Sequence, residues 1–257
     1  MRLDLLLVKQ NLAESREKAK HLILSGFVSV DGSVVQKPAA DVDETAPVAV
    51  SEKEKYVGRG GLKLEAALDR FYLDPTGLSA LDIGASTGGF TDCLLQHGAA
   101  HVTALDAGRD QLHPSLASDD RVTCIEKYNA RDLNAADVGR FDLVVMDVSF
   151  ISATCILPRI PAVLKSDGRL ILLIKPQFEA GRAALDKHGV VKKAADREAA
   201  VHRVLDAAAE VSLACLGLIA SPVAGGDGNR EYLALFCAER DADNRRVPVS
   251  DVVSEGV

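Results

Sequence analysis

The sequence contains no long hydrophobic run. No apolar stretch reaches the roughly 18 residues that a membrane-spanning helix needs, and the longest, around residues 213–220, has the length of a buried strand. A signal peptide is not expected either, because Asp4 and Lys9 interrupt the apolar stretch at the N-terminus and no cleavage-type segment follows. We therefore expect no membrane contact and a cytoplasmic location.

Cysteine is present without a pattern. The five cysteines are odd in number, scattered and embedded in apolar runs, so they form neither a disulfide framework nor a set of metal ligands. Buried thiols in a reducing cytoplasm are the simplest interpretation, and no metal site is predicted. The cysteines are at positions 93, 124, 155, 215 and 237.

A surplus of positive charge is also missing. The chain has 30 Lys and Arg against 37 Asp and Glu, which gives a formal net charge of −7. This balance weighs against a protein that coats nucleic acid without selectivity, so any nucleic-acid binding must be local. The 257 residues, 47% of them hydrophobic, suffice for one α/β domain and a small additional module.

The small module is expected at residues 1–60. Residues 2–11 and 16–24 have the pattern of short amphipathic helices, and residues 27–35 that of a β-hairpin around Asp31-Gly32. Basic residues slightly outnumber acidic ones there, and Arg16 and Lys20 lie one helical turn apart. From charge alone, a solvated helix face explains this pattern better than an RNA-binding surface.

The most informative stretch is residues 80–92, where a short apolar strand leads into a glycine-rich turn and a helix. Glycines at 84, 88 and 89 allow close approach of a ligand, and Asp106 follows about twenty residues later, as in nucleoside-binding sheets. The turn lacks the second glycine of the dinucleotide-binding pattern, which weakens the hypothesis of a nicotinamide dehydrogenase. The pattern indicates a nucleoside-type ligand, with a tight turn that binds no ligand as the alternative.

The remaining elements alternate between strand and helix. This order predicts an α/β domain over residues 61–240, with a doubly wound, mostly parallel sheet covered on both faces. Residues 176–190 form an unusually long loop, and residues 241–257 are expected to be a disordered tail. The expected strands after Asp106 are 122–126, 141–147, 169–175, 211–220 and 230–237, with helices at 153–164 and 195–210.

Two charged residues end consecutive apolar strands. Asp147 and Lys175 both fall at the carboxyl edge of the expected sheet, where doubly wound folds bind their ligands. A strand-end aspartate alone can be a simple cap, but an Asp and a Lys together favour a site. Lys63 lies in a first helical turn, which disfavours a cation. Spacing alone does not place Lys63 or Glu231 beside the other two.

The N-terminal module resembles the RNA-binding domain named after ribosomal protein S4. The resemblance rests on Arg2-Leu-Asp4, on residues 15–20 and on residues 23–32, in that order. It implies that basic side chains of the module contact RNA phosphates, which supply affinity and register more than base identity. The residues implied are Arg2, Lys9, Arg16, Lys20 and Lys37.

The whole chain resembles the TlyA family, over residues 1 to about 238. Four motifs carry the likeness, at residues 81–92, 146–152, 173–179 and 228–232. The family joins an S4-type domain to an FtsJ-like ribose methyltransferase domain, which implies a Rossmann-like fold with a seven-stranded sheet. The resemblance places the catalytic Lys-Asp-Lys-Glu set on Lys63, Asp147, Lys175 and Glu231.

The resemblance also implies S-adenosylmethionine as cofactor. Its methionine end would lie at the turn and helix start, Asp106 would hold its ribose, and Asp147 would lie beside the methyl group. The implied cofactor-binding residues are Asp82, Gly84, Ser86, Thr87, Gly88, Gly89, Asp106 and Asp147.

The implied activity is 2′-O-methylation of ribose, of cytidine in the family, in 16S and 23S ribosomal RNA. Free ribosomal RNA or ribosomal subunits would be the partner, and loss of methylation would alter sensitivity to cyclic-peptide antibiotics that bind the ribosome. Family members are also called hemolysins, but a membrane-acting toxin needs a spanning segment or a strongly basic amphipathic helix, and neither is visible. An RNA-binding protein with an inactive transferase domain is a third hypothesis, which the complete tetrad opposes.

Overall fold

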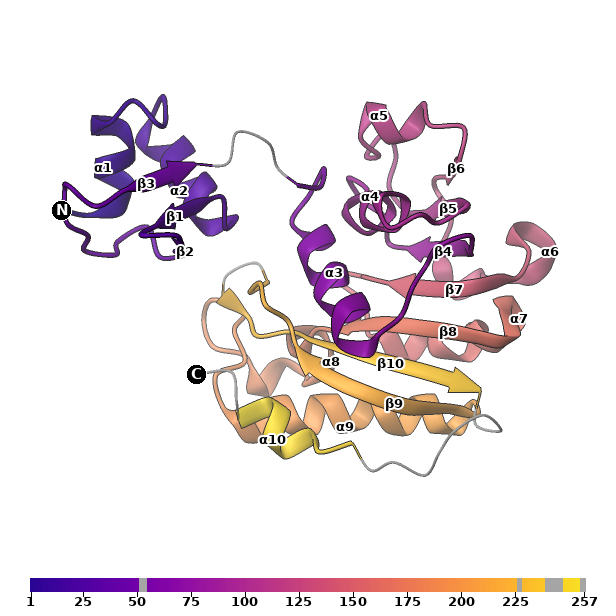
Figure 1. Cartoon of the computed structure of the whole chain (residues 1–257). Helices are drawn as coiled ribbons and strands as arrows, with labels where there is room; N and C mark the ends of the chain where they lie inside the picture. Colours follow the sequence, from indigo (N-terminus) through magenta and orange to yellow (C-terminus); the bar gives the residue numbers. More distant parts are fainter. Residues whose placement is uncertain (51–54, 226–227, 239–246, 255–257) are drawn as a thin grey trace. The chain divides into compact units, whose positions relative to one another are not determined.

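The computed structural model describes residues 1–50, 55–225, 228–238 and 247–254. The chain forms two compact units, Met1–Lys55 and Tyr56–Val257 (Figure 1). This division falls before Tyr56, whereas the sequence placed it after residue 60. The Tyr56 side chain, 3% exposed, lies in the apolar core of the second unit and packs against Gly61, so residues 56–60 belong with that unit.

The first unit packs two helices on a small antiparallel sheet. The strand order is β2-β1-β3, and the β1–β2 turn is Asp31-Gly32, both with positive φ (50° and 76°), as a two-residue hairpin turn of this kind requires. Apolar residues of helices and strands share one core, among them Leu3, Leu7 and Ile23. The elements are α1 Leu3–Lys9, α2 Arg16–Leu24, β1 Val28–Val30, β2 Ser33–Val34 and β3 Val48–Val50.

The second unit is built on a seven-stranded sheet of order β6-β5-β4-β7-β8-β10-β9. The strands from β6 to β8 pair in parallel, and β10 is antiparallel to both its neighbours. This confirms the predicted doubly wound, mostly parallel α/β architecture. The strands are β4 Ser79–Ile83, β5 His101–Leu105, β6 Val122–Ile125, β7 Phe141–Met146, β8 Leu164–Ile174, β9 Leu213–Ala220 and β10 Tyr232–Ala238.

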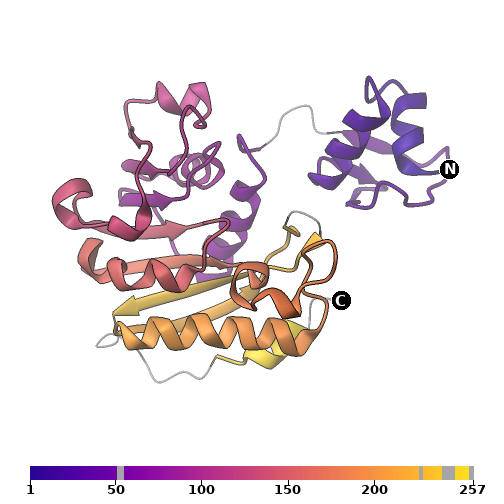
Figure 2. The same ribbon diagram turned by 180° about the vertical axis from the view of Figure 1, so that it is seen from behind.

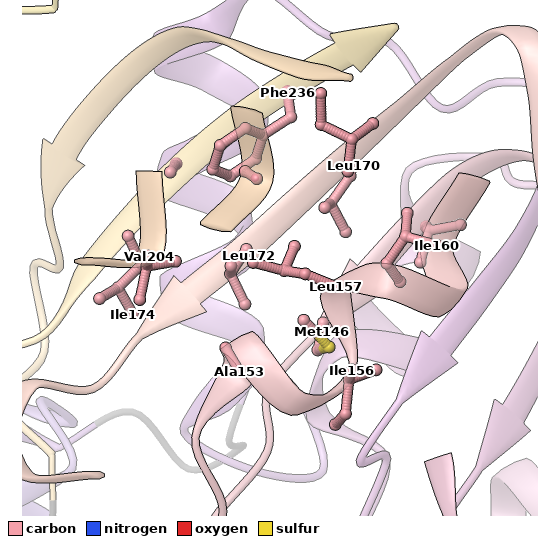
Figure 3. Close-up of a cluster of buried hydrophobic side chains, with 14 of the residues drawn as sticks. Met146, Ala153, Ile156, Leu157, Ile160, Leu170, Leu172, Ile174, Val204 and Phe236 are labelled. Atoms are coloured by element: carbon pink, nitrogen blue, oxygen red, sulfur yellow. The ribbon is translucent and has the colours of Figure 1, made fainter. Parts of the chain in front are cut away.

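Helices cover both faces of this sheet (Figures 1 and 2). Side chains of β8 alternate between two apolar clusters, with Leu170, Leu172 and Ile174 in one cluster and Ile171 and Leu173 in the other, as the period of a strand requires. The first cluster, shown in Figure 3, includes residues of α7 and α9; the second includes residues of α3 and α4. The helices are α3 Gly60–Phe71, α4 Gly89–Gln96, α5 Pro114–Ala117, α6 Ala135–Val138, α7 Ile160–Val163, α8 Pro176–Glu179, α9 Ala194–Glu210 and α10 Val249–Ser254, with 3-10 turns η1 Ala130–Asp132, η2 Ala153–Cys155, η3 Leu157–Arg159 and η4 Arg182–Ala184.

The prediction of a disordered tail over 241–257 is wrong for its described part. Residues 249–254 form helix α10, and Val249 and Val253, 5% and 1% exposed, join the apolar cluster that includes α9. The two valines are four residues apart and so share one helical face, but a helix of six residues gives too little periodicity to predict it. The other residues of the expected tail, 241–246 and 255–257, lie outside the described residues.

Candidate active site

The site lies at the switch point of the sheet. Strands β4 and β7 are neighbours, and the chain order runs from β4 toward one edge and from β7 toward the other. Gly84 directly follows β4 and Asp147 directly follows β7. Gly84 has φ of 84°, and a Cβ atom there would collide with the backbone oxygen of Asp147. Only glycine lets the turn after β4 pass so close to the end of β7.

The glycine-rich turn then starts a helix. Gly88, with φ of 96°, precedes the first residue of α4, and a Cβ atom on it would collide with the side chain of Leu116. The Asp106 carboxylate fixes the turn by accepting the backbone N–H of Ser86 at 2.8 Å and that of Gly108 at 2.7 Å. The first backbone N–H groups of a helix have no partner within that helix, so the start of α4 is of the kind that suits an anionic group.

Asp82 is a fully buried acid below this turn. One carboxylate oxygen accepts a hydrogen bond from the Thr91 hydroxyl at 2.7 Å, and the other, Oδ1, has no hydrogen-bond partner among the residues that the structure describes. Burial raises the pKa of Asp82 to about 7, against the lowering effect of Thr91, and the charges of Asp147 and Asp106 add to the rise. An orphan carboxylate oxygen of this kind suits a ligand that brings a positive charge.

The structure brings Lys63, Asp147, Lys175 and Glu231 together as two ion pairs. Lys63 Nζ lies 2.5 Å from Glu231 Oε2, and Lys175 Nζ lies 2.5 Å from Asp147 Oδ1. Strands β7 and β8 are parallel neighbours, so their ends carry Asp147 and Lys175 to one edge. Tyr232 pairs with Ile174 across β10 and β8, which sets Glu231 beside the end of β8. The catalytic roles of the four residues stay a prediction.

All four side chains line one cavity of about 280 Å³. They are well shielded from solvent, from 2% exposed for the Glu231 side chain to 20% for that of Asp147. Desolvated ion pairs of this kind are not a strong source of stability, because each charge loses its hydration. Their presence at a cavity therefore favours a functional role. Asp82, Gly84, Ser86, Thr87 and Gly89 of the predicted cofactor set line the same cavity.

A second cavity of about 670 Å³ adjoins the first. The two share Gly84, Ser86, Asp147 and Ser149 in their walls, so they form one cleft across the switch point. Asp106 of the predicted set lines the larger cavity. Gly88 lines neither cavity and lies against the side chains of Leu112 and Leu116. The volume falls within the range of small-molecule sites.

Sequence reasoning missed two polar residues of the site. Ser149 Oγ accepts a hydrogen bond from Lys175 Nζ at 2.8 Å, so Lys175 is held by Asp147 and Ser149 together. Gln177 Nε2 donates to Glu231 Oε1 at 3.2 Å. Each lies two positions after a predicted catalytic residue and within one of the four motifs shared with the family. Their place in these motifs could have identified them from the sequence.

The loop after β7 is fastened to helix α8. Glu179, 3% exposed, accepts the backbone N–H of Ala153 at 2.7 Å and the hydroxyl of Ser152 at 2.5 Å, and its burial raises its pKa. The same two segments bring the rings of Phe150 and Phe178 to 5.5 Å between centroids. Phe150 is 93% exposed, has φ of 64° and lines the larger cavity.

The predicted RNA-contacting residues are all exposed on the first unit. Arg2 and Arg16 both bond to the buried carboxylate of Asp4. Lys9 instead forms an exposed ion pair with Glu44 at 2.5 Å, so part of its charge is already balanced. Lys20 and Lys37 complete the predicted set.

Comparison with known proteins agrees with both units. Residues 56–237 match the FtsJ-like methyltransferase family, and residues 1–48 match the S4 domain. A relative from Mycobacterium tuberculosis, named 16S/23S rRNA (cytidine-2′-O)-methyltransferase TlyA, is 41% identical over 259 residues, covering 100% of this chain and 97% of the relative. The chain belongs to the TlyA family.

Other TlyA relatives carry a different name. Hemolysin A of Brachyspira hyodysenteriae is 42% identical over 92% of this chain and 99% of its own. A solved structure from Streptococcus thermophilus, also named a hemolysin, is 40% identical with a TM-score of 0.77, covering 99% of this chain and 94% of that chain. Within the described ranges of this TlyA family member, none of the helices combines the length and apolar character needed to cross a bilayer.

Proposed function

We propose that this TlyA family member transfers the methyl group of S-adenosylmethionine to a ribose 2′-hydroxyl of ribosomal RNA. The observation that carries the proposal is the pair of shielded ion pairs, Lys63 with Glu231 and Lys175 with Asp147, in one cavity with the glycine-rich turn. The name of the M. tuberculosis relative supports ribosomal RNA as the substrate and cytidine as the target nucleoside.

The cleft fits S-adenosylmethionine on its own chemistry. The buried Asp82 oxygen, which has no hydrogen-bond partner in the described part of the chain, suits the positively charged methionine end, and the N–H groups at the start of α4 suit its carboxylate. The larger cavity, with Asp106 in its wall, has room for the adenosine end. Asp147 and Ser149 line both cavities and so lie where the two ends of the molecule would meet.

The chain's own residues then handle the hydroxyl and its proton. The sulfonium of the cofactor supplies an activated methyl group, so catalysis is chiefly alignment and removal of one proton, and alignment contributes several kcal/mol. Lys175 accepts the proton of the 2′-hydroxyl while Asp147 and Ser149 hold its position. The bound cofactor would supply its methyl group to the 2′-oxygen, and its carbon–sulfur bond would be the bond that breaks. Lys63, paired with Glu231, lines the same cavity, where its amino group would stabilise the developing negative charge on that oxygen.

Methyl transfer to ribosomal RNA tests this proposal. The full chain is incubated with labelled S-adenosylmethionine and one RNA substrate at a time. The substrates are unmethylated 16S RNA, unmethylated 23S RNA and ribosomal subunits. A 2′-O-methyl group blocks attack of the 2′-oxygen on the adjoining phosphate, so we expect label in the RNA and a new alkali-resistant position. Label without any alkali-resistant position would mean that a base is methylated, and the proposal would be wrong.

A further inference from the structure

The first unit contains a buried acid that the transferase chemistry does not use. Asp4, on α1, is 0% exposed, yet it lies between two arginines whose side chains are 43% and 50% exposed. Arg2 donates from Nε to Asp4 Oδ1 at 2.9 Å and from Nη2 to Oδ2 at 3.0 Å, and Arg16 donates from Nε to Oδ2 at 2.9 Å. One buried carboxylate therefore holds two surface guanidinium groups.

The shared oxygen brings the two cations close together. Arg2 Nη2 and Arg16 Nε both bond to Asp4 Oδ2, so these two nitrogens lie no more than about 6 Å apart. Two guanidinium groups at this separation would repel each other without the carboxylate between them. The two arginines hold the pKa of Asp4 well below its usual range, so the carboxyl stays ionised and the cluster keeps a net positive charge.

The backbone under this cluster is fixed as well. Leu3 N–H donates to Ala40 O at 2.9 Å, Asp4 N–H donates to Pro38 O at 3.0 Å, and the backbones of Arg2 and Asp41 form an isolated antiparallel β-bridge. On the second helix, Ser15 accepts the backbone N–H of Lys18 with its hydroxyl at 3.1 Å, which fixes the start of α2 at Arg16. Both arginines thus extend from anchored positions.

We propose that Asp4 is a positioning residue that builds a binding site for an RNA phosphodiester from Arg2 and Arg16. Each guanidinium has five N–H donors, of which Arg2 gives two and Arg16 one to Asp4, so donors beyond these three bonds remain for the two free oxygens of a phosphate. Phosphate contacts of this kind fix the register of an RNA-binding module without reading sequence. The inference rests on the proposed function, because it takes RNA as the partner of this unit.

Replacing Asp4 by asparagine separates positioning from charge. Asp4→Asn makes the first unit more positive, so a purely electrostatic surface would bind RNA more tightly. Positioning predicts the opposite, about a tenfold loss of affinity, because both guanidinium groups lose their fixed orientation. Glu44→Gln is the matched control: it removes one negative charge from the same unit at the exposed Lys9 pair, and we expect equal or tighter binding.

Affinity is measured on the full chain by filter binding to 16S and 23S RNA transcribed in vitro, at several salt concentrations, with circular dichroism as the check of folding. If Asp4→Asn is unfolded, Arg16→Lys is the test variant, because lysine keeps the positive charge but lacks the planar guanidinium group. Positioning by Asp4 then predicts that Arg16→Lys binds RNA more weakly than wild type. Asp4→Asn that is folded and binds as tightly as Glu44→Gln, or Arg16→Lys with wild-type affinity, would overturn the inference. The wild-type chain is assayed for methyl transfer on the same RNA, so a failure of the proposed function shows there separately. A wild type that binds neither RNA overturns the inference, whereas methyl transfer to RNA or to ribosomal subunits tests the proposed function on its own.

Discussion

Asp82 illustrates how single residues of the cleft depart from what folding alone would select. An acid with a folded-state pKa of about 7 binds its proton more tightly when folded than when unfolded. The protein therefore loses stability as pH rises from about 4, the usual pKa of an aspartate, to about 7. The cost is consistent with a residue retained for a cationic ligand.

Replacement of Asp82 by asparagine should remove this pH dependence. We expect the free energy of unfolding of Asp82→Asn, relative to wild type, to increase between pH 5 and pH 7.5, because only the wild type must ionise a buried carboxyl over that range. Urea denaturation of both proteins at the two pH values is the measurement. A relative stability that is constant or decreasing with pH would show that Asp82 is already ionised at pH 5.

At the scale of elements, the site depends on how the loop after β7 is fastened to α8. Glu179 accepts two hydrogen bonds from that loop, which carries Asp147 and Ser149. Glu179→Ala leaves the buried N–H of Ala153 without its acceptor, at a cost of about 1–3 kcal/mol, and we expect about a tenfold slower methyl transfer. Glu179→Gln keeps an acceptor and should retain more activity. The methyl-transfer rates of the two variants are measured, and thermal unfolding of each variant reports its stability. An unchanged rate in Glu179→Ala would mean that the site does not depend on these hydrogen bonds.

Helix α10 stabilises the second unit through two valines. Val253→Ala removes two buried methyl groups from the apolar cluster of α9, and we expect a loss of about 1–2 kcal/mol in urea denaturation. Val252 is only half-buried, so Val252→Ala serves as the control with a smaller effect. Equal effects of the two substitutions would contradict the packing of α10.

The sequence anticipated those parts of the fold that depend on local pattern. Strands that end at Asp147 and Lys175 are visible as apolar runs, and parallel neighbours necessarily bring those ends to one edge. The Lys63–Glu231 pair was reached only through the family resemblance, because it depends on β10 inserting antiparallel beside β8, a contact between residues 168 positions apart. Helix α10 was missed because six residues with two inward valines give little periodicity.

At the scale of the whole molecule, a net charge of −7 and an RNA partner are compatible because the basic residues are organised locally. Arg2 and Arg16 are arranged around one acid in the first unit, while two shielded ion pairs, Lys63 with Glu231 and Lys175 with Asp147, line the cleft of the second unit. As proposed above, RNA affinity and methyl transfer depend on different residues, which substitutions can separate.

The most direct test of the central claim is the single-turnover rate of methyl transfer by Lys175→Ala, measured together with its affinity for S-adenosylmethionine. Lys175 is held by Asp147 and Ser149 at the cavity, and removing a group that takes the proton costs about 10²- to 10⁴-fold in rate. We expect a loss of that size with cofactor affinity within about twofold of wild type, as for an interaction made only in the transition state. A parallel loss of affinity and rate, or transfer at the wild-type rate, would contradict the account.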